Sequence, residues 1–282
     1  MRQISTNVFV NVDWEGPNLG LIVTGEGNVL VDSPDSPTEA VAWRKEVEKK
    51  GEVKYLINTD GHPDHFHGNY FLPGTVIASE GARDVILQTT PEEVLDRIKN
   101  VDPAGVPLMS GYKVGVPTIT FKKGPLFLHL GDQVIHCFFI GGHSPNLIAI
   151  HIPREKVIFF GDNVVHKHKT RLHEADPQEW LDSLKLLENM DVDVIVPGHG
   201  HDVCGRDYIS EQASIVRAWM DAVQSAIKQG WSLEEAREKV KCPDPYATSK
   251  RSPNVLREID EIIITRLYNY FLKTDFEVPH MK

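Results

Sequence analysis

The chain has 282 residues, 41% hydrophobic and 25% charged, a composition typical of a globular protein. Its formal net charge of −10 disfavours nucleic acid as a partner, because phosphate binding requires a basic face. No stretch approaches the roughly 18 consecutive apolar residues of a membrane helix, and the first residues lack an apolar signal core. The three cysteines lie far apart, which favours a reducing compartment over a disulfide framework. We therefore expect a cytoplasmic protein without a membrane partner.

The N-terminal part of the chain alternates between strand and helix patterns. Residues 7–32 show the period-two alternation of β-strands. Ser36 opens a helix that runs to about Lys50, where Gly51 ends it, and Val53 to Ile57 form an apolar run typical of a buried strand. The next expected elements are a strand over 75–78, helices over 80–87 and 91–99, and a proline- and glycine-rich loop over the site at 101–118.

The second half of the chain continues with strands and then contains only helix signals. The expected strands are 126–130, 133–140, 147–152, 157–160 and 192–196. Asp176 and Pro177 are typical of a helix start, and further helices are expected over 207–229, from Ser232, and over 255–272. These patterns predict an α/β core in residues 1–205 and a helical appendage in residues 206–282 that packs on the core.

Asp60, His62, Asp64 and His65 follow the apolar strand that ends at Ile57. Three of them are two residues apart, so that one turn directs carboxylates and imidazoles at one point. Clustered His and Asp side chains are the ligands that zinc, iron and manganese use, and strand ends are where α/β folds build sites. The alternative is a solvated polar turn.

Three further ligand candidates also lie where expected strands end. They are His143, Asp162 and His199. Recurrence at four strand ends supports a metal site more strongly than any single motif does. His129, His136 and His151 lie within strands instead, and we interpret them as structural residues.

These motifs resemble the metallo-β-lactamase superfamily, in which Thr-His-x-His-x-Asp-His after a strand is followed by Gly-His, Gly-Asp and Gly-His. The corresponding segments here are Thr59-Asp60-Gly61-His62-Pro63-Asp64-His65, Gly142-His143, Gly161-Asp162 and Gly198-His199. The resemblance covers about residues 7–205. It implies a four-layer αββα sandwich with a dinuclear metal site at one edge.

The resemblance also implies a role for each ligand. Asp60, His62 and His143 would hold the first metal ion, Asp64, His65 and His199 the second, and Asp162 would bridge them with a water or hydroxide. Two divalent cations are expected, with zinc as the first choice and iron or manganese as alternatives.

Asp60 departs from the resemblance, because the family usually has histidine at this position. Asp60 could still be a ligand, could leave a weak first site and a one-metal protein, or could mark a catalytically inactive site. With three aspartates and a bridging hydroxide, the four positive charges of two divalent ions are about neutralised. A less positive site lowers the pKa of bound water less, and an added carboxylate favours iron or manganese over zinc.

Other polar residues near the motifs are open to two interpretations. Asp32 closes an expected strand, either as a turn acid or as a carboxylate that orients a metal-bound histidine. His67 follows the motif and is expected to line the pocket or to form a hydrogen bond in the loop rather than to bind metal. His166 and His168 follow Asp162 and could contact substrate or lie in a solvated loop.

The resemblance implies a metal-dependent hydrolase that uses a metal-bound hydroxide on an ester, lactone or thioester, with Asp64 also guiding protons. The expected partner is a small-molecule substrate, and the chain could form a homodimer. One alternative is an iron-dependent oxidoreductase of the same superfamily, of the sulfur dioxygenase or diiron type. Another is a metal-binding protein without catalysis. The acidic charge disfavours a nuclease.

Overall fold

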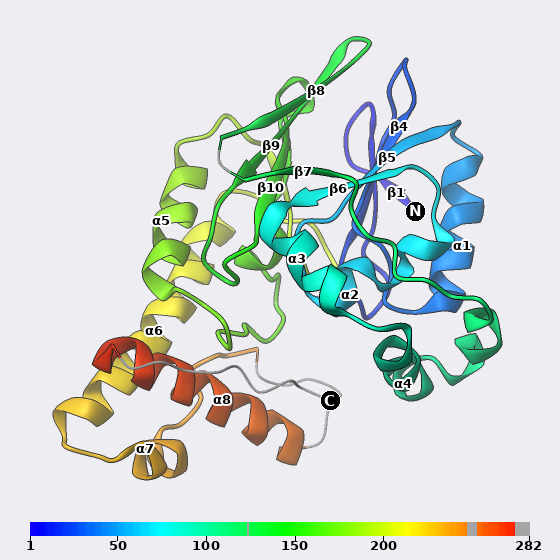
Figure 1. The fold of residues 1–282 in the computed structure, drawn as a ribbon. Coiled ribbons are helices and arrows are strands. Elements are labelled where there is room, and N and C mark those ends of the chain that lie inside the picture. Colours follow the sequence, from blue (N-terminus) through cyan, green and yellow to red (C-terminus); the bar gives the residue numbers. More distant parts are fainter. Residues whose placement is uncertain (123, 247–252, 274–282) are drawn as a thin grey trace.

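Two β-sheets lie face to face, with helices on their outer sides (Figure 1), in a computed structural model that describes residues 1–122, 124–246 and 253–273. The first sheet has, in spatial order, β1 (Arg2–Gln3), β2 (Val8–Asn11), β3 (Leu19–Ile22), β4 (Asn28–Val31), β5 (Val53–Ile57), β6 (Thr75–Ser79) and β7 (Ile119–Phe121). The second has β12 (Val194–Val196), β11 (Val157–Phe159), β10 (Ile148–Ile152), β9 (Gln133–Phe139) and β8 (Leu126–Leu130).

The helices cover the sheets and extend the C-terminal part of the chain. They are α1 (Pro37–Glu48), α2 (Pro63–Phe66), α3 (Glu80–Gln88), α4 (Pro91–Val101), α5 (Pro177–Glu188), α6 (Tyr208–Lys228), α7 (Leu233–Lys239) and α8 (Pro253–Leu272). Short 3-10 helices are η1 (His67–Phe71), η2 (Pro103–Met109), η3 (Pro153–Glu155) and η4 (Gly161–Asn163). Within the described ranges, no helix is both long and apolar enough to cross a bilayer.

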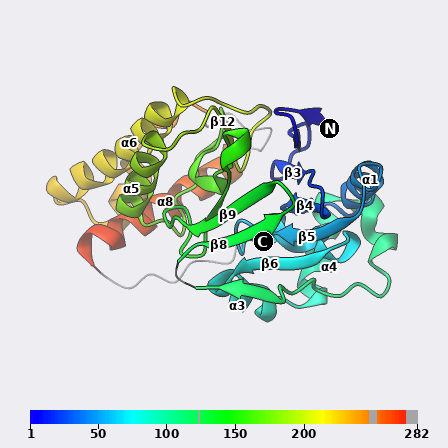
Figure 2. The same cartoon turned by 90° about the horizontal axis from the view of Figure 1, so that it is seen from above.

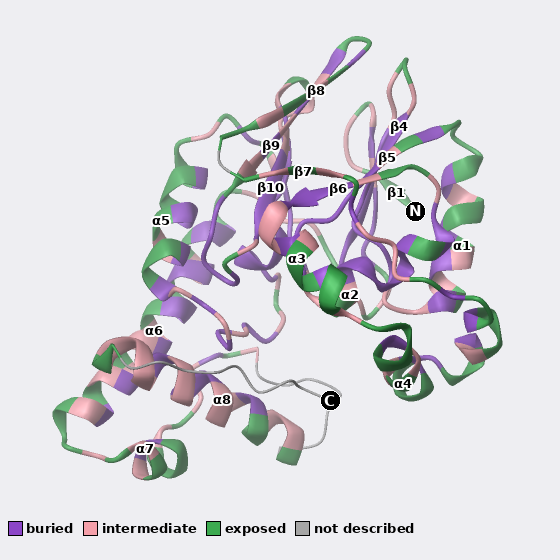
Figure 3. Ribbon diagram, viewed as in Figure 1, coloured by how far each residue is buried: buried purple, intermediate pink, exposed green. Residues whose placement is uncertain are grey.

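Alternation along the strands sends apolar side chains to two different layers. In β4, Val29 and Val31 belong to the cluster between the sheets, whereas Leu30 packs with Trp43 of α1 on the outer side. Ile158 of β11 packs on the outer side of the second sheet, in the cluster that contains α5. The layers are therefore helix, sheet, sheet and helix (Figure 2), which confirms the αββα sandwich predicted from the sequence. Figure 3 shows β4, β6 and β10 largely in purple, the colour of buried residues.

The C-terminal helices pack beside α5 rather than standing apart from it. Val216 and Trp219 of α6 and Ile263 of α8 belong to the same apolar cluster as α5. Lys169 Nζ, on the loop before α5, lies 2.5 Å from Asp260 Oδ1 of α8, and this partly buried pair joins the loop to the last helix. The apolar cluster thus contains residues on both sides of position 205, and the division of the chain there stays a prediction.

The segment 101–118 differs from the sequence prediction. It was predicted to be a loop, and this was wrong for residues 103–109, which form η2 with the Asp102 side chain as its N-cap. Tyr112 then donates a hydrogen bond from its hydroxyl to the His67 carbonyl (3.0 Å), so the segment packs against the turn that follows the motif. The two-residue strand β1 and the three-residue strand β7 were also missed, because so few residues show no alternation.

Candidate metal centre

The candidate ligands lie at one edge of the two sheets. In the second sheet β10 is antiparallel to both β9 and β11, and β12 is parallel to β11, so β9, β11 and β12 end at the same edge. A hydrogen bond from Ile148 N to Thr59 O (2.9 Å) joins this edge to the segment after β5. The residues at these strand ends are Asp60, His62, Asp64 and His65 after β5, His143 after β9, Asp162 after β11 and His199 after β12.

The first group of side chains is Asp60, His62 and His143. Asp60 Oδ2 lies 3.1 Å from His62 Nδ1, and His143 Nε2 lies 3.2 Å from the same nitrogen. His143 Nε2 is also 3.5 Å from Asp162 Oδ2. The three ligand atoms of the group all lie within 4.8 Å of one another, so they can surround one ion.

The second group is Asp64, His65 and His199, on the other side of Asp162. His199 Nε2 lies 3.3 Å from Asp64 Oδ2 and 3.4 Å from Asp162 Oδ2. His65 Nε2 lies 3.6 Å from Asp162 Oδ1. The Asp162 carboxylate therefore contacts both groups, as expected of a bridging ligand.

Both groups fit metal ions by the chemistry of their donor atoms. Among the described residues, Asp60 Oδ2, His65 Nε2 and Asp162 Oδ1 are buried and have no hydrogen-bond partner. Buried polar atoms are normally satisfied, and three such atoms at one place indicate a ligand. Two ligands on a tetrahedral zinc ion about 2.0–2.1 Å away are about 3.3 Å apart, which matches the spacings in both groups.

Outer hydrogen bonds orient three of the histidines. His65 Nδ1 lies 3.0 Å from Asp32 Oδ2, His143 Nδ1 lies 2.9 Å from the Arg171 carbonyl, and His199 Nδ1 lies 3.1 Å from the Gly16 carbonyl. Each oxygen accepts a hydrogen from Nδ1, so the Nε2 lone pair of each ring faces the centre.

Asp32 has the orienting contact that was one of the two sequence interpretations. Its carboxylate also accepts hydrogen bonds from Thr59 N (2.7 Å) and Thr59 Oγ1 (2.6 Å). Its φ of +56° is in the left-handed region, which aspartate and asparagine enter more readily than most residues do. Asp32 is therefore both a turn residue and the carboxylate that orients His65.

Asp60 lies inside the first group, with one oxygen held and the other directed at the ligands. Asp60 Oδ1 accepts hydrogen bonds from Ser144 Oγ (2.8 Å) and Gly61 N (2.6 Å). These contacts leave Oδ2 beside His62. Asp60 Oδ2 is thus placed as an oxygen ligand could be, at the position where the family usually has histidine.

The charges of the centre shift the pKa values of its acids and histidines. Burial raises the pKa of Asp60, but His62 and His143 lower it to about 2. Burial lowers the pKa of His199, whereas Asp162 and Asp64 raise it to about 9. At neutral pH the carboxylates of Asp60, Asp64 and Asp162 are therefore ionised, and His199 is protonated. A metal ion that binds His199 must displace the proton of this histidine.

Gly198 shows why glycine precedes the last histidine of the motif set. A Cβ atom at this position would lie 1.9 Å from Asp162 Oδ1 and 2.7 Å from Asp162 N. Any side chain would therefore displace the carboxylate that contacts both groups.

The structure adds two residues that the sequence prediction missed, His173 and Glu174. Glu174 Oε2 lies 3.3 Å from His62 Nε2, and the ring centroids of His173 and His62 are 5.2 Å apart. Both residues lie in the long connection between η4 and α5, far in sequence from any strand end. The only sequence signal was two adjacent metal-ligand residue types shortly before the helix cap at Asp176.

The remaining histidines near the motifs do not belong to the two groups. His67 Nδ1 lies 2.9 Å from Asp35 Oδ1, in agreement with the expected hydrogen bond in the loop. His168 stacks on His199 with ring centroids 5.8 Å apart, and His166 packs on Tyr208. Substrate contact by His166 or His168 stays a prediction.

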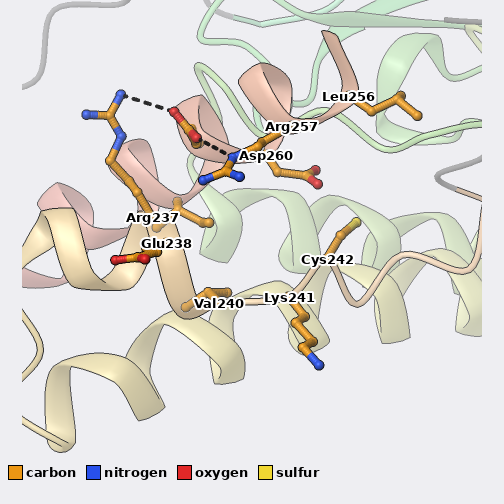
Figure 4. A pocket seen from close by; sticks show the side chains of 10 residues that line it. Arg237, Glu238, Val240, Lys241, Cys242, Leu256, Arg257 and Asp260 are labelled. Atoms are coloured by element: carbon orange, nitrogen blue, oxygen red, sulfur yellow. Dashed lines mark hydrogen bonds and ion pairs between the residues drawn. The ribbon is translucent and has the colours of Figure 1, made fainter. Parts of the chain in front are cut away.

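A hollow away from the strand-end centre lies between α7 and α8 (Figure 4), lined by Arg237, Lys241, Cys242, Arg257 and other residues. Its charges are largely paired within the protein. Glu261 accepts a hydrogen bond from Arg257 (3.0 Å) and lies 4.0 Å from Arg237. The hollow offers no group of buried, unpartnered donor atoms among the described residues, unlike the strand-end centre.

The sequence model of the metallo-beta-lactamase superfamily matches residues 12–199, the segment that contains every candidate ligand. The chain belongs to this superfamily. The match confirms the resemblance expected from the motifs.

Relatives within the superfamily are distant. The chain is 24% identical over 270 residues to a linear primary-alkylsulfatase of Pseudomonas sp., covering 80% of this chain and 50% of that protein. It is 23% identical over 184 residues to a hydroxyacylglutathione hydrolase of Erythrobacter litoralis, covering 65% and 59%, and 29% identical over 219 residues to one of Mesorhizobium japonicum, covering 78% and 73%. The chain thus spans only about half of the alkylsulfatase and 59% of the Erythrobacter enzyme.

Solved structures of the superfamily share the fold. The sec-alkylsulfatase Pisa1 from Pseudomonas sp. has a TM-score of 0.68 at 15% identity, covering 96% of this chain and 50% of that one. A metallo-beta-lactamase from Pontibacter korlensis has a TM-score of 0.57 at 22% identity, covering 76% and 97%. At these identities the likeness concerns the fold alone.

Proposed function

We propose that the chain is a hydrolase that depends on two divalent metal ions at the strand-end centre. The observation that supports this most directly is the position of Asp162, which contacts both three-residue groups. The proposed ligands are Asp60, His62 and His143 for the first ion, Asp64, His65 and His199 for the second, and Asp162 between them.

Bound ions of this kind activate a water molecule and polarise the substrate oxygen that it attacks. The chain supplies the positioning. Asp32 and the carbonyls of Gly16 and Arg171 orient the histidine rings. The Asp64 side chain is partly exposed, so its carboxylate can accept a proton from an approaching water. His168, stacked on His199 and partly exposed, is the proposed substrate contact.

The proposed substrates are esters, lactones or thioesters of small molecules, and zinc is the first choice of metal. The relatives' names add two test compounds, a hydroxyacyl thioester of glutathione and a linear alkyl sulfate. A homodimer stays a prediction.

The test is metal content and hydrolysis of the purified chain on a panel of these compounds. We expect about two metal ions per chain and turnover of at least one compound. His199→Ala should lose metal and activity. His201→Ala is the matched control, because this nearby histidine contacts the Val12 carbonyl instead of the centre. Bound metal without turnover of any compound would favour a metal-binding protein without catalysis.

The carboxylate of Asp60 supports a second candidate function, that of an iron-dependent oxidoreductase of the same superfamily. A carboxylate in the first group adds a hard oxygen ligand, which iron and manganese prefer more than zinc does. Iron in the purified protein together with oxygen uptake in the presence of a sulfur compound would support this candidate over the hydrolase.

A further inference from the structure

His62 has candidate metal ligands on both edges of its ring. Nδ1 faces the first group, at 3.1 Å from Asp60 Oδ2 and 3.2 Å from His143 Nε2. Nε2 faces away from that group and lies 3.3 Å from Glu174 Oε2. This nitrogen is buried and has no hydrogen-bond partner among the residues that the structure describes.

The outer edge of His62 has the same features as the first group. One donor atom each from His62, His173 and Glu174 lie within 4.8 Å of one another. The 3.3 Å separation of His62 and Glu174 matches the spacing of about 3.3 Å between two ligands on a tetrahedral zinc ion. His173 as a whole residue is only 8% exposed, and its Nδ1 is a further buried atom without a hydrogen-bond partner in the described part of the chain.

We propose that His62, His173 and Glu174 form a second, alternative position for the first metal ion, on the outer side of His62. The proposal rests on the proposed dinuclear centre, which defines the inner position at Asp60, His62 and His143. None of the motifs found in the sequence includes His173 or Glu174.

The two positions exclude each other because they share one imidazole. A neutral histidine has one nitrogen with a lone pair and one with a hydrogen, so only one edge can bind an ion at a time. With the ion outside, His62 Nδ1 carries the hydrogen, and its charge partner Asp60 Oδ2 lies 3.1 Å away. The tautomer of His62 thus selects the position.

Exposure and ligand number give the positions different roles. The side chains of Glu174 and His62 are 30% and 16% exposed, whereas those of Asp60 and His143 are 1% and 2% exposed. The outer position is therefore on the solvent side, where an arriving ion meets it first. The inner position has Asp162 as a fourth ligand, so the ion prefers it in the wild-type chain.

The test weakens the inner position by removing Asp60, one of its four ligands, so that the ion can move to the outer position. Purified Asp60→Ala should still hold about two Zn²⁺ per chain, because the outer position accepts the displaced ion. Asp60→Ala combined with His173→Ala should hold about one. Asp60→Ala combined with His166→Ala is the matched control and should hold about two, because His166 lies on the same loop but packs on Tyr208. Loaded with Co²⁺, Asp60→Ala should also show a visible spectrum that differs from the wild-type spectrum and loses intensity in the double variant.

Two results would overturn the outer position. One is a loss of one ion in Asp60→Ala alone, and the other is retention of two ions in the double variant with His173→Ala. If Asp60→Ala fails to fold, His143→Ala replaces it in both arms of the test. A wild-type chain that holds fewer than two ions contradicts the dinuclear centre instead, which separates the two failures.

Discussion

The two ligand groups of the centre differ in how firmly the chain holds them. In the second group, His65 is bonded to the buried Asp32 carboxylate and His199 to a backbone carbonyl. In the first group, His143 is likewise bonded to a backbone carbonyl, but the only outer neighbour of His62 among the described residues is the partly exposed Glu174 carboxylate, and candidate ligands face both edges of its ring. On the proposal above, the second group holds one arrangement, whereas the first permits more than one. The departure from the family pattern at Asp60 also falls in the first group.

Removing the residue that both groups share should have the largest effect. Asp162→Asn takes away the charge that pairs with His65, His143 and His199. We expect metal content below one ion per chain and a loss of hydrolysis of about 10³-fold or more, because metal stabilisation of the transition state is worth several kcal/mol. Asp202→Asn is the control, since this acid pairs with Arg2 at the surface. Full metal content in Asp162→Asn would mean that the two groups bind independently.

Substituting the carboxylate beside one histidine of each group, Asp32 beside His65 and Glu174 beside His62, shows how firmly each group is held. Asp32→Asn keeps a residue that tolerates the left-handed backbone but removes the charge beside His65. Affinity for the ion of the second group should fall about 10- to 100-fold, as measured by competition with a chromogenic chelator. Glu174→Gln should weaken the ion of the first group much less, because His62 keeps its Nδ1 contacts. Equal losses would contradict the difference in how the groups are held.

Asp60→His should make the first group resemble the usual family pattern. The change removes one negative charge, and a unit charge about 4 Å away is worth about 1 kcal/mol or more in polar surroundings. The pH-rate profile should therefore move about one unit lower, and zinc should be retained better relative to manganese. The second group, which includes Asp64, is unchanged in this variant, so its ion serves as the internal reference. An unchanged profile would show that Asp60 does not influence the reacting water.

The smallest expected effect is a difference in proton release. Burial lowers the pKa of His62 and His65, but neighbouring acids raise both well above the usual value, and His199 rises to about 9. His143 instead has a lowered pKa, through burial. Filling the first group at pH 7 should release about one proton and filling the second about two. Above pH 9 the second number should fall by about one, since His199 has then lost its proton. Calorimetry in buffers of different ionisation enthalpy measures both numbers, and equal release from the two steps would contradict the assignment.

Most residues of the candidate centre could be proposed from the sequence because they lie close to strand ends. Asp60, His62, Asp64 and His65 follow one apolar run, and short-range patterning was enough to place them. His143, Asp162 and His199 were chosen because each follows an expected strand, and α/β folds build sites at strand ends. The αββα layers were expected from the family resemblance, whereas the residue patterns alone predicted only an α/β core with a helical appendage.

What the sequence could not predict depends on the path of long connections. His173 and Glu174 lie on a loop whose course is set by contacts such as Lys169 with Asp260 of α8, about 90 positions later in the chain. No local pattern encodes such a contact. The helix η2 was missed because its prolines and glycine are typical of loops, although Asp102 before Pro103 is also a helix-start signal.

The placement of the ligands on two sheets has a consequence for folding. His62 follows β5 of the first sheet and His143 follows β9 of the second, so an ion held between them acts as a cross-link across the seam of the sandwich. The binding geometry exists only after the sheets have docked, and an ion therefore binds the native state selectively. At a free ion concentration about 1,000 times the dissociation constant, one such cross-link adds about 4 kcal/mol to the free energy of unfolding. Metal supply would then set not only the activity of the chain but also its lifetime against unfolding.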